Sequence, residues 1–287
     1  MSTTLKPPPK PPPLSPPPLP KSNGPARQFV LEDVNPVSAY RIALYGSGGI
    51  GKTSLACLAS RVLGRVGFID LDESLGVIKR SLPDDLKIKR MAGMADWQDV
   101  RDAVNSHETW QGCDALIIDS MTRAEELAMA WTVRNIPHEK GHKVTRLEDY
   151  GFGKGVEHVY ETYLPLFADL DQHWRKGRTV IVICHETASE VPNPRGEDFL
   201  RWEPRLQAPK KGKSSIRAKL KEWCDQLSFI AYDMVVQDGV ASGKGSRAIY
   251  SSEQPWAMAK GRLVKDVVVY REGDDEFWRL IFGERSN

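Results

Sequence analysis

The chain alternates between short apolar runs and stretches in which apolar residues recur every three or four positions. Short apolar runs between polar turns are typical of strands that are buried on both faces of a sheet. Such runs predict strands at residues 42–45, 66–70, 86–91, 115–119 and 179–184. Helical spacing predicts helices at residues 55–63, 97–104 and 156–167. Strands that alternate with helices predict an α/β fold with a mainly parallel central sheet flanked by helices.

Shorter apolar segments in the last part of the chain predict additional strands. Residues 248–251 and 256–258 have a strand pattern, and residues 263–270 show a strand-like alternation. Residues 277–282 are apolar enough to dock against the rest of the fold. We therefore expect extra C-terminal strands beside the central parallel set.

Composition separates the first 27 residues from the rest of the chain. This segment holds 11 of the 20 prolines and no acidic residue. It cannot bury a core, and its proline content favours an extended tether. We expect a disordered proline-rich tail at residues 1–27 and a single folded domain at residues 28–287. The simpler interpretation of the tail is a spacer, and the alternative is a ligand for a proline-binding partner protein.

Charge and cysteine usage narrow the classes of protein that fit. Lys6, Lys10, Lys21 and Arg27 give the tail a charge of +4, so the remainder carries −2 within the net charge of +2. A folded part that is not globally basic can bind nucleic acid only through a local patch. The four cysteines form no C-x-x-C pair, and no run of about 20 apolar residues could span a membrane. These features predict a protein of the reducing cytoplasm without a membrane segment.

A phosphate-binding loop follows the first predicted strand. Residues 46–53 read GSGGIGKT, the full G-x-x-x-x-G-K-T pattern, and a predicted helix follows directly. The glycines let backbone N–H groups curl around phosphate oxygens at the positive end of that helix. Lys52 would contact the β- and γ-phosphates, and the hydroxyl of Thr53 would bind Mg²⁺. The predicted nucleotide-binding residues are Gly46, Ser47, Gly48, Gly49, Ile50, Gly51, Lys52, Thr53 and Ser54.

Two other predicted strands end in residues suited to the same site. Asp119 ends the strand at 115–119 in a Walker B pattern, and it would hold Mg²⁺ opposite Thr53. His185 follows the strand at 179–184. Because the carboxyl ends of parallel strands line the ligand crevice, His185 is placed to contact the γ-phosphate or the attacking water. The alternative is a histidine that only caps the end of the strand.

Three carboxylates end the second predicted strand, and one of them is expected to orient the attacking water. Side chains alternate along a strand, so Asp70 and Asp72 point one way and Glu73 the other. One of the three can reach the crevice while the others cap the next turn. The alternation does not decide which carboxylate does so.

The segments GSGGIGKTS, FIDLDES, ALIIDS, IVICHE and AKGR together resemble the RecA-type core ATPases, and most closely the phage-encoded RecA-like single-strand-annealing proteins. The resemblance covers about residues 38–265. It implies a RecA-like P-loop NTPase core that uses ATP and Mg²⁺, assembles as a homo-oligomer and works in a bacterial or phage-infected cytoplasm. It also implies that Asp72, with Glu73 beside it, stands where the family has its water-activating glutamate, and that His185 matches the polar sensor.

The same resemblance gives a role to Lys260 and Arg262. They look like the Lys-x-Arg element with which related ring and filament ATPases reach the γ-phosphate held by the neighbouring subunit. A cation at that position would stabilise the charge that develops during phosphoryl transfer. We therefore expect both residues to act in trans, and the alternative is an ordinary basic turn between strands.

A basic segment lies within residues 186–225, which show no clear strand pattern and are expected to be irregular. In single-strand binding, cations follow the phosphates and aromatic rings stack on the bases. In RecA-like proteins the loop after this strand contacts DNA, which agrees with the composition here. The residues expected to bind single-stranded DNA are Arg205, Lys210, Lys211, Lys213, Arg217, Lys219, Lys221 and Trp202.

Alternatives remain for this segment and for the function. Ile216, Leu220 and Trp223 have the spacing of a helix face that packs on the core, with the lysines only solvated. A flexible turn at residues 149–155 is a second candidate for DNA contact. The favoured function is an ATPase that acts on single-stranded DNA in recombination or annealing. The alternatives are a nucleotide-gated binding module with little turnover and a small-molecule P-loop kinase.

Overall fold

The computed structural model describes residues 31 and 33–283, except residues 211, 234, 238–239 and 243–244. The proline-rich segment 1–27 and Lys211 therefore lie outside the described residues. Residues from Val37 onward belong to one compact unit. No helix among the described residues is long and apolar enough to cross a membrane.

A ten-stranded sheet runs through this unit in the order β12-β10-β7-β1-β5-β4-β2-β3, with β11 paired to β7 and β6 to β5. The strands from β7 to β3 along this order pair in parallel, and the others are antiparallel additions. The predicted α/β class with extra C-terminal strands is therefore confirmed. The strands are β1 (Arg41–Gly46), β2 (Val66–Asp70), β3 (Ile88–Met91), β4 (Ala115–Asp119), β5 (Thr179–Val191), β6 (Phe199–Pro204), β7 (Gln226–Tyr232), β10 (Arg247–Tyr250), β11 (Lys260–Gly261) and β12 (Val267–Tyr270), with a separate pair β8 (Val235–Gln237) and β9 (Val240–Ser242).

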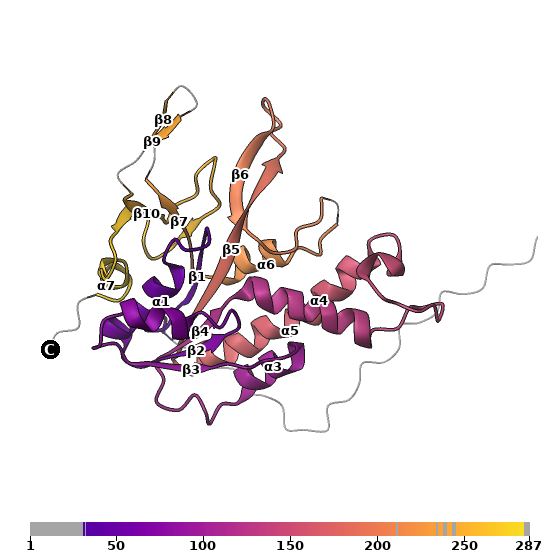
Figure 1. The fold of residues 1–287 in the computed structure, drawn as a ribbon, viewed down its shortest axis with the longest axis horizontal. Coiled ribbons are helices and arrows are strands. Elements are labelled where there is room, and N and C mark those ends of the chain that lie inside the picture. The colour runs from indigo at the N-terminus through magenta and orange to yellow at the C-terminus, as the bar shows by residue number, and fades with distance from the viewer. Residues whose placement is uncertain are drawn as a thin grey trace, which may run out of the picture. The chain divides into compact units, whose positions relative to one another are not determined.

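Helices cover both faces of the sheet, which separates two hydrophobic cores (Figure 1). Alternate side chains of β1 point to opposite faces, so Tyr45 packs with residues of α3 to α6, whereas Leu44 packs with residues of α1, α2 and α7. The helices are α1 (Lys52–Leu63), α2 (Leu75–Ile78), α3 (Trp97–Asn105), α4 (Met121–Asn135), α5 (Lys154–Arg175), α6 (Ile216–Trp223) and α7 (Glu276–Phe282), with short 3₁₀ turns η1 (Lys79–Ser81) and η2 (Leu147–Tyr150).

The expectation of an irregular segment at residues 186–225 is wrong for β5, β6 and α6, and it holds only for the loops between them. Strand β5 continues to Val191 and pairs with β6, so the two strands form a hairpin that projects from the sheet (Figure 1). This outer part of β5 alternates partly buried with exposed residues and has no continuous apolar run, because it lies beyond the helices that bury the inner part. The pairs Ala188–Trp202 and Val191–Phe199 fix the register. An apolar-run criterion finds only the inner half of such a strand.

Two further expectations need correction. Residues 256–258 do not form a strand, and Ala257 makes only isolated bridges to Gln254 and Trp202. The strand expected at 263–270 is limited to β12, at Val267–Tyr270. The alternative interpretation of the basic segment is confirmed for α6, which buries Ile216, Leu220 and Trp223.

Candidate nucleotide-binding site

The phosphate-binding loop joins the carboxyl end of β1 to the first residue of α1. Gly51 has φ 102°, a left-handed backbone conformation that favours glycine. Gly46 is required for a different reason, because a Cβ at that position would lie 2.3 Å from the carbonyl oxygen of Ile230 in β7. The two glycines therefore let the loop turn sharply while it stays packed against the neighbouring strand.

Lys52 lies in the mouth of this loop. Its ammonium donates hydrogen bonds to the carbonyl oxygens of Gly46 at 2.9 Å and Ser47 at 2.7 Å. Burial lowers the pKa of Lys52, and the nearby carboxylates of Asp119 and Glu186 oppose this effect. Phosphate oxygens are stronger acceptors for an ammonium than carbonyl oxygens are, so a nucleotide would draw Lys52 to its phosphates.

Thr53 and Asp119 face one another across the site, at 2.6 Å between Thr53 Oγ1 and Asp119 Oδ2. Asp119 is buried, and burial raises its pKa to about 6 although the Thr53 hydroxyl donates to it. No group of three or more His, Cys, Asp or Glu side chains in the described ranges could hold a metal alone. A hydroxyl and one carboxylate suit Mg²⁺, which takes its other ligands from water and phosphates. When bound, Mg²⁺ would neutralise phosphate charge here.

Strand β5 lies between β1 and β4, so the end of its inner half, at residues 183–185, stands between the phosphate-binding loop and Asp119. The register places His185 opposite Gly46. His185 Nε2 lies 3.3 Å from Asp72 Oδ2, which links β5 to the turn after β2. Burial alone would raise the pKa of Asp72, but hydrogen bonds from His185 and Ser120 hold it below its usual range. Asp72 is therefore a stable carboxylate that can accept a hydrogen bond.

The three carboxylates after β2 have different surroundings. Asp70 is fully buried, accepts hydrogen bonds from the backbone N–H groups of Ser74 and Leu75, and pairs with Arg90 at 3.1 Å. Its oxygens therefore hold the start of α2 and are not directed to solvent. Glu73 is exposed and adopts a positive φ of 52°. The geometry favours Asp72 for the role that the strand alternation left open.

Glu186 is a residue of this site to which sequence reasoning gave no role. It directly follows His185, it is partly buried, and it interacts electrostatically with Lys52. Burial raises the pKa of Glu186, and Lys52 opposes that shift. The signal was its position at the end of an apolar run, the same signal that pointed to His185.

A family model described as an AAA domain matches residues 38–263. The chain belongs to this AAA domain family. Among solved structures, it is similar to a KaiC-like protein from the hyperthermophilic archaeon Pyrococcus horikoshii, with 13% identity, a TM-score of 0.42 and coverage of 81% of this chain and 89% of that chain. No curated protein matches it. The family and the loop geometry agree with the predicted P-loop ATPase core, and the resemblance to annealing proteins stays a prediction.

In this AAA domain, the two expected trans residues have different environments. Lys260 Nζ donates to the carbonyl oxygens of Lys221, Glu222 and Cys224, at 2.6–2.9 Å, and so caps the C-terminal end of α6. Arg262 is 62% exposed and lies 3.5 Å from Asp225. Lys260 would have to release three carbonyl groups to reach another subunit, so the trans prediction depends on Arg262.

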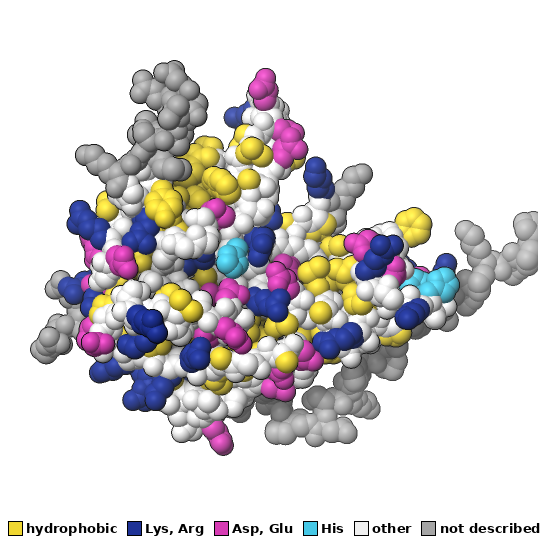
Figure 2. All heavy atoms as spheres, in the orientation of Figure 1, with side chains coloured by type: hydrophobic (Ala, Val, Ile, Leu, Met, Phe, Trp, Pro, Cys, Tyr) yellow, Lys and Arg dark blue, Asp and Glu magenta, His cyan; other side chains and the backbone are white. Residues whose placement is uncertain are grey.

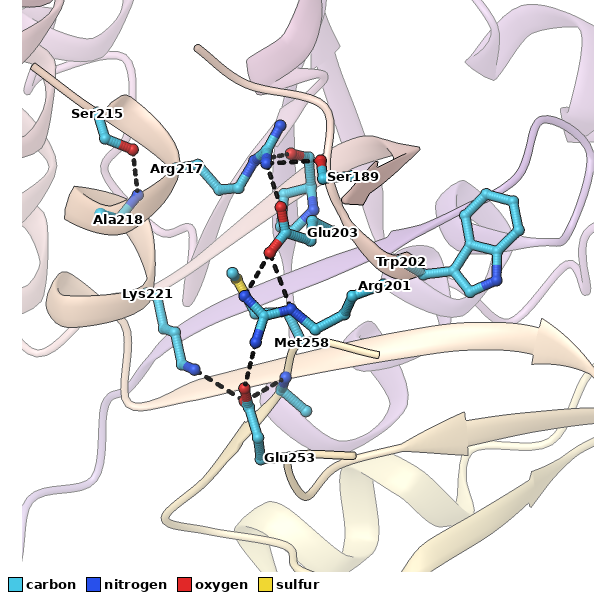
Figure 3. A network of polar contacts seen from close by, with 12 residues as sticks. Ser189, Arg201, Trp202, Glu203, Ser215, Arg217, Ala218, Lys221, Glu253 and Met258 are labelled. Atoms are coloured by element: carbon cyan, nitrogen blue, oxygen red, sulfur yellow. Dashed lines mark hydrogen bonds and ion pairs between the residues drawn. The ribbon is translucent and has the colours of Figure 1, made fainter. Parts of the chain in front are cut away.

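Two of the expected DNA-binding cations, Arg217 and Lys221, take part in an ion network inside the domain (Figure 3). Glu203 is 4% exposed and pairs with Arg217 and Arg201. Glu253 pairs with Lys221 at 2.8 Å and with Arg201 at 3.3 Å. These contacts fasten the base of the hairpin to α6, and they neutralise the cations that make them.

The remaining members of the predicted set do not share one surface with Trp202. In Figure 3 the Trp202 ring points away from the network and from α6. Lys210 and Lys213 are exposed, Lys219 is partly exposed, and all three have no ion-pair partner among the described residues. Arg205 lies 3.8 Å from Glu126 on an exposed surface. Basic and acidic side chains are interspersed on the face that Figure 2 shows.

Proposed function

We propose that this AAA domain protein is a Mg²⁺-dependent ATPase that acts on single-stranded DNA in recombination or annealing. One observation carries the proposal: the basic segment begins at a residue hydrogen-bonded to the nucleotide site. The N–H of Arg205 donates to the carbonyl of His185 at 2.8 Å, and Thr122 Oγ1 accepts from the N–H of His185 and donates to the carbonyl of Arg205. A shift of His185 would therefore move Arg205.

Hydrolysis requires a cation at the phosphates and a group that orients water. Lys52 supplies the cation. Asp72 accepts a hydrogen bond from the attacking water, because its low pKa keeps it ionised, and His185 holds Asp72 in place at 3.3 Å. The proton then leaves with the product phosphate. Glu186, next to Lys52, is the second acceptor within the same crevice.

The DNA part of the proposal rests on the cations that no described carboxylate neutralises. Lys210, Lys213 and Lys219 lie on or beside the loop that Arg205 begins. Three or four ion pairs between lysines and the phosphates of a single strand give a moderate affinity that depends strongly on salt. Subunit assembly would add sites along the strand, and Arg262 is the exposed residue that would link one subunit to its neighbour's phosphates.

Fluorescence anisotropy with a labelled oligo-dT tests this function. The full chain is titrated with a non-hydrolysable ATP analogue, with ADP and without nucleotide. The proposal expects binding that is tightest with the ATP analogue and weakens with salt. Equal DNA binding in all three nucleotide states would contradict the coupling between nucleotide and DNA. No DNA binding in any state would contradict the proposal that DNA is the substrate.

A second candidate is a nucleotide-gated module that binds a protein partner. The hairpin favours it, because its exposed charged side chains are three acidic (Glu190, Glu197 and Asp198) and one basic (Arg195), a balance that repels DNA phosphates. Slow ATP turnover that DNA does not change, together with normal nucleotide binding, would favour this candidate over the first.

A further inference from the structure

The outer side of the phosphate-binding loop is held by two side chains from the C-terminal strands. Arg247 in β10 donates from Nη1 to the carbonyl oxygen of Ile50 at 2.9 Å. Tyr270 in β12 donates its hydroxyl to the carbonyl oxygen of Gly51 at 3.0 Å. The two residues are directly paired across the strands, and the guanidinium carbon of Arg247 lies 4.5 Å from the centre of the Tyr270 ring.

This contact is closely packed and keeps both donors in place. Tyr270 is 3% exposed, and burial raises its pKa to about 12, so its hydroxyl stays protonated as a donor. A Cβ on Gly51 would lie 2.7 Å from Arg247 Nη1 and 3.0 Å from the Tyr270 ring. The absence of a side chain at Gly51 therefore serves this contact as well as the backbone turn.

The hydrogen bonds fix the directions of two peptide groups. In a planar trans peptide the C=O and the following N–H point to opposite sides. A carbonyl of Ile50 held outward by Arg247 therefore turns the N–H of Gly51 inward. The carbonyl of Gly51 accepts from the N–H of Leu55 at 2.9 Å as well as from Tyr270, so the first turn of α1 and Tyr270 together turn the N–H of Lys52 inward. Inward N–H groups are the donors with which such a loop binds phosphate oxygens.

We propose that Arg247 and Tyr270 are positioning residues that orient the loop amides for the phosphate chain of the nucleotide. The inference rests on the nucleotide site and not on the DNA part of the proposed function. A donor that is held in its binding direction before the ligand arrives has less freedom to lose, and this raises affinity. The effect acts on the phosphates, so it is the same for ATP, ADP and inorganic tripolyphosphate.

Calorimetric titration of the full chain with ADP and with tripolyphosphate tests the inference, beside the melting temperature of the unliganded protein. Arg247→Ala removes a charge-assisted hydrogen bond, and we expect both ligands to bind about 10- to 100-fold more weakly. Tyr270→Phe keeps the ring and changes no charge, and we expect a loss of about three- to tenfold. Tyr250→Phe is the matched control, because Tyr250 lies in β10 but its ring contacts Phe229 and Trp256 instead of the loop.

Three results would overturn the inference. One is unchanged affinity in both variants with a lower melting temperature, which is the signature of strand packing alone. Another is a loss for ADP that is absent for tripolyphosphate, because the residues would then act on the nucleoside. The third is an equal loss in Tyr250→Phe. If Arg247→Ala does not fold, Tyr270→Phe alone decides. Failure of the unmodified chain to bind either ligand would contradict the nucleotide site itself.

Discussion

The phosphate-binding loop and the basic segment at residues 205–221 both stand out in the sequence, but the structure treats their charged groups in opposite ways. At the loop, Lys52 contacts only carbonyl oxygens, which a phosphate can replace. In the basic segment, Arg217 and Lys221 are neutralised by Glu203 and Glu253. The loop therefore offers its cation to a ligand, whereas the segment uses part of its charge to hold the fold together.

The difference comes from how each feature is encoded. The loop can be recognised from eight consecutive residues, because the G-x-x-x-x-G-K-T pattern is local. The electrostatic character of the basic segment depends on carboxylates elsewhere in the chain, and Glu253 lies 32 positions from Lys221. A count of cations in one segment overestimates its free charge whenever the fold brings such partners to it.

The largest effect is expected at the loop. Lys52→Ala removes the cation that would contact the phosphates, and we expect ATP turnover to fall by about 10²–10³-fold. The fold should survive, because the side-chain hydrogen bonds of Lys52 to described residues go only to carbonyl groups of its own loop. Steady-state phosphate release and a melting curve measure the two properties. Turnover within twofold of the unmodified chain would contradict the assignment of the site.

Lys260 supports the fold, whereas Arg262 is exposed, so substitutions at the two positions should have different effects. Arg262→Ala is expected to abolish most turnover, by about 10²-fold or more, while ATP binding and the melting temperature stay nearly unchanged. Lys260→Ala is expected to lower the melting temperature, because three carbonyl groups at the end of α6 lose their donor. Normal turnover in Arg262→Ala would remove the trans role.

Glu203→Gln tests whether the ion network holds the hairpin base. Removal of one partner from a buried pair costs about 3 kcal/mol of unfolding free energy, because Arg217 and Arg201 keep their charge. Urea unfolding measures the change. Glu253→Gln is the control in the same network, and with 43% of its side chain exposed we expect a loss of at most about 1 kcal/mol. Equal losses of unfolding free energy in the two variants would show that the burial of Glu203 does not strengthen its ion pairs.

A smaller effect is expected from the cations that have no carboxylate partner among the described residues. Replacement of Lys210, Lys213 and Lys219 by serine should reduce the salt slope of oligo-dT binding by about 2, since each single-strand contact contributes about 0.7. Lys221→Ser is the matched control, because Lys221 is already paired with Glu253 and should change the slope little. A larger change of the salt slope in Lys221→Ser than in the triple variant would indicate that DNA binds on the side of α6 that faces Glu253.

A pH-dependent effect is expected at Glu125 in α4, which accepts a hydrogen bond from the N–H of Gln207 at 2.6 Å. Burial raises its pKa to about 7 from the usual 4.5. The folded chain keeps this proton between those values while the unfolded chain loses it, so the contribution of Glu125 to stability falls as pH rises to 7 and levels off above.

Glu125→Gln stays neutral at every pH and should remove that slope. We expect the gap between the melting temperatures of variant and unmodified chain to shift by about 5–10 °C between pH 5 and pH 8, in favour of the variant at pH 8. Glu126→Gln, at an exposed neighbour, should leave the gap constant. An unchanged gap for Glu125→Gln would show that the carboxyl titrates normally.

The parallel core and the nucleotide site could be predicted because their signals are local. Apolar runs place β1, β2, β4 and the inner half of β5. The run of β1 ends at the phosphate-binding loop, and the other three end at polar residues that the sheet brings beside it. The outer half of β5 gave no such signal, because one-sided burial leaves polar residues along it. The contacts of Arg247 and Tyr270 with the loop join positions about 200 residues apart, and only the folded sheet reveals them.

The role of Asp72 shows an intermediate case. Strand alternation grouped Asp70 with Asp72, yet the strand ends at Asp70 and the turn that follows separates the two side chains. Asp70 turns to the start of α2 and to Arg90, whereas Asp72 reaches His185. Alternation predicts direction within a strand, and it fails one residue beyond the strand end.

The most direct test of the account is ATP hydrolysis by the full chain, with and without single-stranded DNA, at two salt concentrations. If the basic segment that starts at Arg205 transmits DNA binding to His185, DNA will stimulate turnover strongly at low salt and weakly at high salt. Turnover that is the same with and without DNA at both salt concentrations would contradict the link between the nucleotide site and single-stranded DNA.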